Sequence, residues 1–440
     1  MSLEQRLKDR SAKIGIVGLG YVGLPLAVEY AKKGFTVVGI DVDGRKVSKI
    51  NFGENYIQDV NDDDLKNVVK EGKLSATTTY DLVPEMDAIY ICVPTPFNVN
   101  KDPDISYIVN SAQGIATGLR KGQVIILKST TYPGTTEQDV QPILEKTGLK
   151  VGTDFHLAFS PERIDPGRQD FTTANTPIVV GGVTPGCTKA ASMVIKQAIN
   201  IVHEVSSPRV AEMEKLLENI FRSVNIALVN ELARMCDRMG GVDIWEVVEA
   251  AATKPFGFMP FFPGPGIGGH CILVDPYYLS WKAREYDFHT SFIELAAKTN
   301  EDMPFYVAGL VRKSLSNTGV SFKDAKILML GVSFKKDIDD MRNSPAVKVM
   351  ELLSQRGAKG IQYNDPYVPE FKLFGEVQQS VELTAELLRE QDVVVITTNH
   401  SDYDPKFIVE NSTAVVDTRN VCKGINAPDK IIKLGAGEPF

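Results

Sequence analysis

The residues AKIGIVGLGYVGLPLAVEYAKKGFTVVGIDVD (12–43) decide the fold class. A short apolar strand ends at Val17 and is followed by three glycines in G-x-G-x-x-G spacing, namely Gly18, Gly20 and Gly23. A run of helical periodicity, 24–33, then leads to a second apolar strand, 36–40, which ends in Asp41. A strand, a glycine turn, a helix and a strand in this order are typical of a doubly wound α/β domain.

The glycines of this turn have separate roles. The first permits a tight bend, the second lets the backbone approach a pyrophosphate, and the third lets the helix pack against the strand. A diphosphate is then bound by the unpaired amides at the helix N-terminus. Asp41 can accept hydrogen bonds from an adenosine ribose and would repel a 2′-phosphate, so the stretch predicts an NAD site. Lys46 is a further candidate for a cofactor phosphate, the alternative being a solvated lysine.

Two more strands of the same domain end in polar residues. They lie within DAIYICVPTP (87–96) and QVIILKSTTYPGT (123–135), which are continuous apolar runs typical of buried parallel strands. Ligands of such sheets bind beyond the carboxyl ends of the strands. We therefore expect Thr95, Ser129 and Thr130 at the cofactor crevice, although a hydroxyl that only closes a turn is the alternative for each.

From residue 322 the chain repeats this pattern. The repeated apolar strands with polar ends are DAKILMLGVSFK (324–335), EQDVVVITTNHSDY (390–403) and STAVVDTRN (412–420). This predicts a second doubly wound unit, but one that keeps only Gly331 of the glycine motif, so we do not expect it to bind a dinucleotide in the same way. It could hold a nucleotide, for which Lys335, Arg342 and Arg419 supply positive charge; ordinary surface cations are the alternative.

A long helix is predicted between the two halves, in SSPRVAEMEKLLENIFRSVNIALVNELARMCDRMGG (206–241). It would begin after Ser206 or Ser207 and end before two glycines, a length of about 30 residues or roughly 45 Å. Its later part is apolar on most faces, which predicts burial between domains or subunits. Lys215 and Asn219, four residues apart, share one face, with a solvated face as the alternative. The predicted fold class is α/β, with two Rossmann-like doubly wound domains joined by this central helix.

The composition excludes several classes of protein. A chain of 440 residues is too long for one ordinary domain, and we divide it into 1–205, 206–320 and 321–440. A net charge of −8 argues against a nucleic-acid partner, which needs a basic face. No apolar run reaches the roughly 18 residues of a membrane span, and the charged N-terminus lacks the apolar region of a signal peptide. We therefore expect a cytoplasmic protein without a membrane partner.

Cys271 follows a run of glycines and prolines in PFFPGPGIGGHC (260–271) and is either a buried small hydrophobe or a nucleophile. The five cysteines are widely spaced without a C-x-x-C pair, so we expect neither a disulfide framework nor a zinc site. His270 is adjacent to Cys271, but adjacent residues rarely both face one ion, so no metal is expected. A thiol in a reducing compartment is inert or reactive, and the loop alone does not decide which.

The chain resembles the nucleotide-sugar 6-dehydrogenases, which comprise UDP-glucose, UDP-N-acetylhexosamine and GDP-mannose dehydrogenases. The resemblance extends from Ile14 to about Arg419 and rests on seven motifs in order: GLGYVGLPLA, CVPTP, KSTTYPGT, FSPERIDPG, EKLLENIFRSVNIALVNEL, GPGIGGHC and GVSFKKDIDDMRNSP. Within the family, KPFGFMPFFPGPGIGGHC followed by YYLSWKAREY looks most like the branch that oxidises UDP-N-acetylglucosamine.

The resemblance implies a four-electron oxidation of the C6 alcohol of the sugar to a carboxylate, with two NAD and no metal. A thiolate would add to the intermediate aldehyde, and the thiohemiacetal would lose hydride to become a thioester that water hydrolyses. By this resemblance Cys271 is the nucleophile, and Lys215 and Asn219 stabilise the oxyanion at C6. The further catalytic residues that it implies are Asp275, which works with the lysine and a water, Glu162 as acid or base, and Thr130, which positions water.

The resemblance also implies binding residues and a partner. The NAD site would comprise Gly18, Leu19, Gly20, Tyr21, Val22, Gly23, Asp41, Lys46, Thr95, Thr130 and Arg342. The UDP-sugar would be bound by Glu162, Arg163, Lys215, Asn219, Gly268, Lys335 and Arg419. Members of the family pair through the long helix, so a homodimer is expected.

The sequence departs from the family pattern at three places. Leu273 stands where proline is common two residues after the cysteine, and Asn343 stands where glutamate is common. The UDP-glucose branch carries a sugar-binding arginine before the glycine loop, whereas no arginine occurs here between Ala250 and Gly266. That difference fits a sugar with an N-acetyl group.

Other functions stay open at this point. The substrate alternatives within the family are UDP-N-acetylmannosamine, UDP-N-acetylgalactosamine and UDP-glucose. A two-electron hydroxyacid dehydrogenase would share the N-terminal fold and a lysine on the linking helix, but would need neither Cys271 nor the second nucleotide-type domain. A non-catalytic NAD-binding protein gains no support, because every expected catalytic position is occupied.

Overall fold

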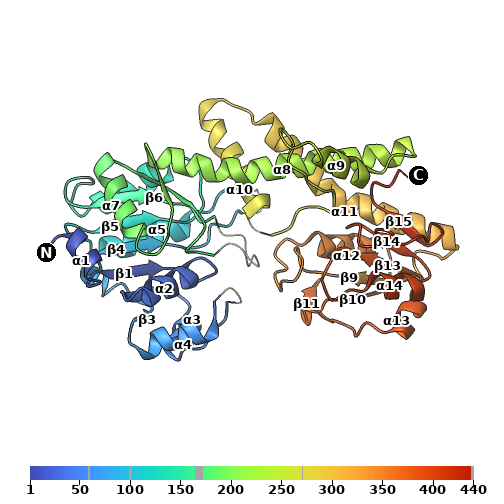
Figure 1. Ribbon diagram of the computed structural model, residues 1–440, viewed down its shortest axis with the longest axis horizontal. Helices are drawn as coiled ribbons and strands as arrows, with labels where there is room; N and C mark the ends of the chain where they lie inside the picture. The colour runs from blue at the N-terminus through green and yellow to red at the C-terminus, as the bar shows by residue number, and fades with distance from the viewer. Residues whose placement is uncertain (58–59, 99–101, 164–171, 270, 438–440) are drawn as a thin grey trace. The chain divides into compact units, whose positions relative to one another are not determined.

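The chain folds into two compact units (Figure 1). The computed structural model describes residues 1–57, 60–98, 102–163, 172–269 and 271–437. The first unit comprises Met1–Glu218 and Tyr277–Phe288, and the second comprises Asn219–Pro276 and His289–Phe440. The division into three domains at 205 and 320 is not tested by this partition and stays a prediction.

The first unit is built on an eight-stranded sheet. Its strands are β1 (Lys13–Val17), β2 (Thr36–Ile40), β3 (Leu74–Thr77), β4 (Ala88–Ile91), β5 (Val124–Leu127), β6 (His156–Phe159), β7 (Ile178–Gly182) and β8 (Val202–Val205). They lie in the order β3-β2-β1-β4-β5-β6-β7-β8, and all neighbours are parallel except β6 and β7. The chain crosses from one side of β1 to the other between β3 and β4, so the ligand crevice of such a sheet is expected beyond β1 and β4.

Helices bury both faces of this sheet. They are α1 (Leu3–Lys8), α2 (Gly23–Lys32), α3 (Gly44–Asn51), α4 (Asp62–Lys70), α5 (Ser106–Ala116), α6 (Gln141–Glu145) and α7 (Pro185–Ile195), with short turns η1 (Val83–Glu85) and η2 (Thr136–Val140). Successive strand residues enter different cores: one contains Ile14, Ile16, Val37 and Tyr90, and the other contains Val17, Ile89, Ile91 and Leu127. Continuous apolar strands are what a sheet covered on both faces requires.

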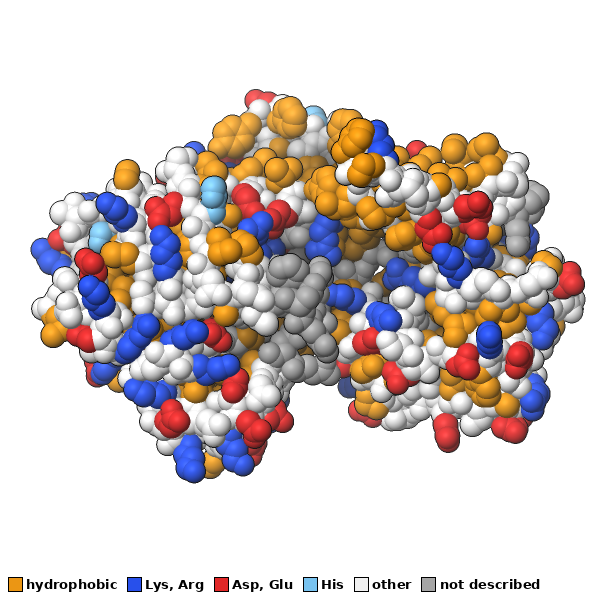
Figure 2. Space-filling model, in the orientation of Figure 1, with side chains coloured by type: hydrophobic (Ala, Val, Ile, Leu, Met, Phe, Trp, Pro, Cys, Tyr) orange, Lys and Arg blue, Asp and Glu red, His pale blue; other side chains and the backbone are white. Residues whose placement is uncertain are grey.

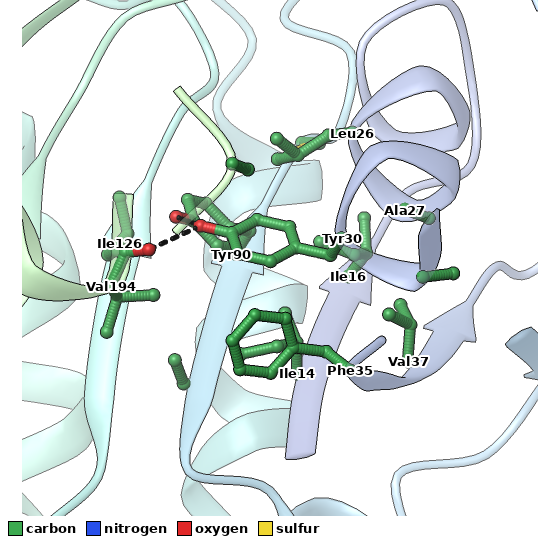
Figure 3. Packing of buried hydrophobic residues seen from close by; sticks show 14 of the residues in the cluster. Ile14, Ile16, Leu26, Ala27, Tyr30, Phe35, Val37, Tyr90, Ile126 and Val194 are labelled. Atoms are coloured by element: carbon green, nitrogen blue, oxygen red, sulfur yellow. Dashed lines mark hydrogen bonds between the residues drawn. The ribbon is translucent and has the colours of Figure 1, made fainter. Parts of the chain in front are cut away.

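The first core contains one buried polar pair (Figure 3). The hydroxyls of Tyr30 on α2 and Tyr90 on β4 lie 2.6 Å apart, and the Tyr30 hydroxyl donates to the Val194 carbonyl over 3.0 Å. Since Tyr30 uses its proton for Val194, Tyr90 donates to the Tyr30 oxygen. The pair thus connects α2, β4 and α7 through one chain of hydrogen bonds.

The second unit contains an all-parallel five-stranded sheet. Its strands are β9 (Lys326–Leu330), β10 (Gly360–Asn364), β13 (Val393–Ile396), β14 (Val415–Asp417) and β15 (Ile431–Lys433), in the order β10-β9-β13-β14-β15. β11 (Glu370–Leu373) and β12 (Glu376–Gln379) form a separate two-stranded hairpin, whose Phe371 packs against Tyr363 of β10. Its helices are α9 (Ile244–Ala252), α11 (Ser291–Thr318), α12 (Pro345–Gln355), α13 (Ala385–Glu390) and α14 (Pro405–Asn411). The prediction of two doubly wound units is confirmed.

Two helices contribute residues to both units: α8 (Pro208–Met239) and α10 (Cys271–Ala283). The predicted long helix is confirmed as α8, which has 32 residues. The Ser207 hydroxyl caps it by accepting from the Val210 amide over 3.4 Å, and Gly240 follows its end with φ of 74°. Among the described residues, no helix is long and apolar enough to cross a membrane.

The tyrosine pair predicts an ordered effect of two conservative substitutions. Tyr30→Phe should lower the free energy of unfolding by about 1–3 kcal/mol, because Val194 loses a donor and the Tyr90 hydroxyl loses its acceptor. Tyr90→Phe should cost less, because the Tyr30 bond to Val194 survives. Urea unfolding followed by circular dichroism measures both; an equal or larger loss for Tyr90→Phe would contradict this arrangement.

Candidate functional site

The glycine turn of the first unit is packed to distances that only glycine permits. Gly18 has φ of +90°, and a Cβ atom on it would lie 2.6 Å from the carbonyl oxygen of Cys92. A Cβ atom on Gly23 would lie 1.8 Å from the carbonyl oxygen of Gly18. Gly20 has open space around its Cβ direction, with nothing described within 4 Å. The turn is therefore closed against the protein at its ends and open at its middle glycine, where a ligand can approach.

The N-terminus of α2 resembles those of α5 and α6 and differs from those of α3, α4 and α7. Side chains cap α3 by Asp43, α4 by Asn61 and α7 by Thr184, whereas α5 and α6 form no such cap among the described residues. At the N-cap of α2, Val22, no side-chain cap is formed within the described part of the chain. Its first-turn amides thus suit an anionic ligand group.

Asp41 lies just after β2, beside this turn. One carboxylate oxygen accepts from the Leu19 amide over 2.8 Å and the other from the Asp43 amide over 2.9 Å, and the side chain is 8% exposed. Lys46 Nζ lies 3.5 Å from Asp41 Oδ2. Binding of Lys46 to a cofactor phosphate, as predicted, would therefore compete with its ion pair to Asp41. An open glycine, an uncapped helix and a fixed carboxylate together fit the diphosphate and ribose of NAD.

The other predicted NAD residues of the first unit lie at strand ends. Thr95 is buried, and its carbonyl accepts from the Tyr278 hydroxyl of α10. The Ser129 hydroxyl donates to the Val93 carbonyl over 2.7 Å. This is the alternative given above, in which the hydroxyl closes a turn. Thr130 is half-buried, and Tyr21 is 45% exposed.

A charged cluster lies at the carboxyl ends of β5 and β6. Glu162 Oε2 lies 3.2 Å from Nζ of Lys128, a lysine that sequence reasoning missed. The guanidinium of Arg163, a predicted substrate contact, lies 3.3 Å from Glu214, pairs also with Glu218 and donates to the Pro177 carbonyl. Arg163 is thus engaged with α8, and its substrate role stays a prediction.

The predicted helix pair of α8 is buried. Lys215 is 8% exposed and Asn219 is 3% exposed. The alternative of a solvated helix face is therefore wrong, and both polar side chains are buried. Asn219 Nδ2 donates to Asp275 Oδ2 over 2.5 Å, and Asp275 is itself buried on α10. The thiol of Cys271 and residue His270 lie outside what the structure describes, but Cys271 begins α10. Asp275 therefore follows one helical turn after Cys271.

The glycine loop before Cys271 packs on the second unit's own strand ends. A Cβ atom on Gly268 would lie 2.4 Å from Cβ of Phe334, next to Lys335, and one on Gly264 would lie 2.6 Å from Nη1 of Arg419. The Gly269 amide donates to the Arg342 carbonyl over 2.7 Å. The structure thus brings the loop together with the Arg419 side chain, the Arg342 backbone and the residue before Lys335.

Each of these cations has a distinct environment. Arg419 donates from Nε to the Thr397 carbonyl over 3.0 Å, and burial lowers the pKa of its guanidinium to about 10, so it stays charged at neutral pH. The Arg342 side chain pairs with Asp340 at 2.6 Å. The Lys335 carbonyl accepts from the Ser333 hydroxyl over 2.9 Å.

Two departures from the family pattern have structural contexts. Asn343 has φ of 51°, a left-handed conformation that asparagine adopts more readily than glutamate, and its side chain donates to the Gly269 carbonyl over 3.0 Å. Leu273 lies in the first turn of α10, where proline would also be tolerated.

The second unit has the same backbone arrangement after its first strand as the NAD turn, but its aspartate is bound by other groups of the protein. Gly331 donates to the Asn364 carbonyl as Gly18 donates to that of Ile40, and Asp365 accepts from the Val332 and Ser333 amides over 2.7 and 3.0 Å. Asp365 also pairs with His400 Nε2 at 3.1 Å, and its other oxygen accepts from the Tyr367 and Val368 amides. Although burial opposes ionisation, the His400 bond and these amides lower the pKa of Asp365. Its lone pairs are committed, so it has little capacity left for a ribose.

Three family profiles match consecutive parts of the chain. The NAD binding domain of the UDP-glucose/GDP-mannose dehydrogenase family matches residues 12–199, its central domain matches 209–302, and its UDP binding domain matches 328–424. The chain belongs to this family. It is an NAD-dependent nucleotide-sugar dehydrogenase, as the resemblance of its motifs predicted.

Individual relatives cover most of the chain. UDP-N-acetyl-D-glucosamine 6-dehydrogenase of Pseudomonas aeruginosa is 37% identical over 82% of this chain and 84% of its own. NDP-N-acetyl-D-galactosaminuronic acid dehydrogenase of Ralstonia nicotianae is 36% identical over 93% of this chain and 96% of its own. The solved structure of UDP-D-ManNAc dehydrogenase from Pyrococcus horikoshii has a TM-score of 0.88 at 33% identity and covers 97% of this chain and 100% of its own.

The glycine packing predicts a selective loss of cofactor binding. Gly23→Ala should weaken NAD binding at least about tenfold, because the added Cβ collides with the Gly18 carbonyl and pushes α2 away from β1. Titration calorimetry with NAD measures this. Gly44→Ala is the control, since its Cβ meets nothing within 4 Å and should leave the affinity unchanged. NAD affinity within twofold of wild type in Gly23→Ala would contradict the assignment.

Proposed function

We propose that this enzyme oxidises the C6 hydroxyl of a UDP-N-acetylhexosamine to the carboxylate, with UDP-N-acetylglucosamine as the substrate. The observation that carries the proposal is the buried bond from Asn219 to Asp275, because it ties α8 to the helix that Cys271 begins. A buried amide held by a carboxylate has its remaining donor directed, which suits recognition of an oxyanion. A two-electron hydroxyacid dehydrogenase has no need of this arrangement.

The choice of sugar rests on the sequence and on the relatives. The relatives from Pseudomonas aeruginosa and Salmonella typhi, 37% and 36% identical, are UDP-N-acetyl-D-glucosamine 6-dehydrogenases. Relatives at 36% identity also include a UDP-N-acetyl-D-mannosamine dehydrogenase and the galactosaminuronic acid enzyme, so these four relatives act on N-acetylhexosamine derivatives. The absence of arginine between Ala250 and Gly266 is consistent with that class. Lys254, the nearest cation, lies 4.9 Å from the ring centroid of Phe256.

The proposed reaction uses the thiol of Cys271 between two oxidations. NAD, held by the glycine turn, Asp41 and the strand-end residues, would supply the hydride acceptor. Cys271 adds to the C6 aldehyde as a thiolate, which forms a C–S bond and turns the carbonyl oxygen into an oxyanion. Lys215 and Asn219 donate hydrogen bonds to that oxyanion, and Asp275 orients the Asn219 amide.

The second half of the reaction releases the acid. Once C6 is a thioester, Glu162 takes a proton from a water that Thr130 orients, and the hydroxide adds to the carbonyl carbon. The C–S bond breaks, the electron pair returns to the Cys271 sulfur, and the sugar leaves as a carboxylate. Lys335, Arg419 and Gly268 would bind the UDP portion, and Arg342 would contact the cofactor. We place this chemistry in the cytoplasm, where the thiol stays reduced.

The stoichiometry of a substrate panel tests the proposal. Purified enzyme should form two NADH per acid released from UDP-N-acetylglucosamine, and little from UDP-glucose. Cys271→Ser should bind NAD normally yet release no acid. The serine hydroxyl has a much higher pKa than a thiol, so it stays protonated and does not replace the thiolate as a nucleophile. One NADH per product, or unchanged acid release by Cys271→Ser, would refute the thiol mechanism. If the enzyme preferred UDP-N-acetylmannosamine or UDP-N-acetylgalactosamine, the proposed substrate would be wrong and the proposed mechanism would stand.

We further propose that the enzyme is a homodimer that pairs through α8 and α9. Figure 2 shows hydrophobic side chains gathered over these helices. Leu228, Met235 and Val247 are 54%, 46% and 46% exposed, whereas Val229 and Ala233 are buried in the core of the second unit. Exposed apolar side chains on this scale mark an interaction surface, and the isologous partner is a second copy of the chain.

Charge placed on this surface should separate the subunits. Leu228→Glu combined with Met235→Glu should convert a dimer into a monomer in sedimentation velocity, because two buried carboxylates per subunit would lack partners. Val377→Glu on the hairpin is the control, since Val377 is 53% exposed outside this surface. A wild-type monomer, or a dimer that survives the double substitution, would disprove the pairing.

A further inference from the structure

A lysine is buried at the end of β5, in the first unit. The Lys128 side chain is 1% exposed, its Nζ lies 3.2 Å from Glu162 Oε2, and it donates to the Pro161 carbonyl over 3.2 Å. Moving an ammonium out of water costs several kcal/mol unless a partner compensates. The Pro161 carbonyl and the Glu162 carboxylate are consecutive along the chain, so this buried lysine binds one short segment, 161–162.

The carboxylate of Glu162 is held from a second direction. Its Oε1 accepts from the Arg163 amide over 2.8 Å. The Arg163 side chain is in turn fixed by Glu214 and Glu218 on α8 and by the Pro177 carbonyl. Lys128 and the Arg163 amide therefore hold different oxygens of one carboxyl group, which fixes its plane.

Titratable groups near this carboxylate and its neighbour Arg163 come from three elements. Cys92 follows β4, and burial raises the pKa of its thiol to about 12, so it is neutral near pH 7. On α8, burial and the neighbouring Glu218 raise the pKa of Glu214 to about 7, while Lys215 adds positive charge beside both. Lys128 is a cation in direct contact with Glu162, and a cation at this distance favours the ionised carboxyl.

We propose that Lys128 is a positioning residue that keeps Glu162 ionised and oriented as the base for thioester hydrolysis. The inference rests on the function proposed above. In that step Glu162 removes one proton from water as the oxygen bonds to the thioester carbon and the C–S bond breaks. A carboxylate that is already ionised can accept this proton at once, whereas a protonated one cannot. Lys128 thus extends to lower pH the range in which acid is released.

The predicted effect is a shift in the pH dependence of one step. In Lys128→Met the pKa of Glu162 should rise, because the neighbouring positive charge is gone. At pH values below the raised pKa of Glu162, the rate of acid release should fall about tenfold for each unit by which that pKa has increased. The rate should recover as the pH increases above it. Lys128→Arg should retain most of the wild-type profile because it keeps the charge. Trapping the thioester by acid quench and mass spectrometry of the Cys271 peptide should show its accumulation in Lys128→Met at pH 6.

Matched variants separate this role from a loss of folding. Lys121→Met removes an exposed lysine that pairs with Asp154, and should leave the profile unchanged. The double variant Lys128→Met/Glu162→Gln removes both partners, so no unpaired charge stays buried, and thermal unfolding and NAD titration show whether it is folded. Its rate of acid release should equal that of Glu162→Gln within about twofold, because the lysine acts through the glutamate.

The outcomes are distinguishable. Wild-type acid release by Glu162→Gln would refute the role of Glu162 in the proposed function. Slow release by Glu162→Gln, with a wild-type pH profile in Lys128→Met, would overturn the inference about Lys128 and leave the proposed function standing. A further loss of more than tenfold in the double variant relative to Glu162→Gln would also overturn it, since Lys128 would then act independently of Glu162. The substrate is the panel sugar that the wild type oxidises.

Discussion

A space too narrow for any side chain separates the start of α2 from the end of β1. The missing Cβ of Gly23 leaves room for the Gly18 carbonyl, and that of Gly18 leaves room for the carbonyl of Cys92. These contacts set the positions of a strand, a helix and the neighbouring strand at one edge of the sheet. Asp41 lies at the same edge because β2 is parallel to β1, so the positions of these polar groups depend on two glycines that have no Cβ atom, Gly18 and Gly23.

The two units use one backbone frame for different purposes. In each, a glycine after the first strand donates to the residue that ends the adjacent strand, and an aspartate after that strand accepts from the turn. In the first unit the aspartate accepts from two amides and lies 3.5 Å from the Lys46 ammonium. In the second, His400 and two further amides complete its hydrogen bonds. The number of hydrogen bonds made within the protein therefore differs between the two carboxylates, and it is the larger at the one that stabilises the fold.

The sequence predicted what depends on local pattern and missed what depends on sheet order. The strand at 36–40, the long helix and the glycine turn follow from periodicity and spacing, and the motifs identified the family. Lys128 begins the KSTTYPGT motif, but nothing in the local sequence links it to Glu162, which lies 34 positions later and meets it only when β5 and β6 are neighbours. The pairing of Arg163 with α8 was hidden for the same reason. Asn343 looked like a lost glutamate until its left-handed backbone was seen.

The completed hydrogen bonds of Asp365 limit how the second unit can evolve. Reinstating the two missing glycines after Gly331 would restore the shape of a dinucleotide turn, yet the acid beside it would still be bound to His400. To free Asp365 for a ligand, substitutions would be needed both in its own loop after β10 and in the loop after β13 that carries His400. Either substitution alone would leave a buried group without its partner. The internal hydrogen bonds of Asp365 therefore oppose any change that would free this carboxylate for a dinucleotide.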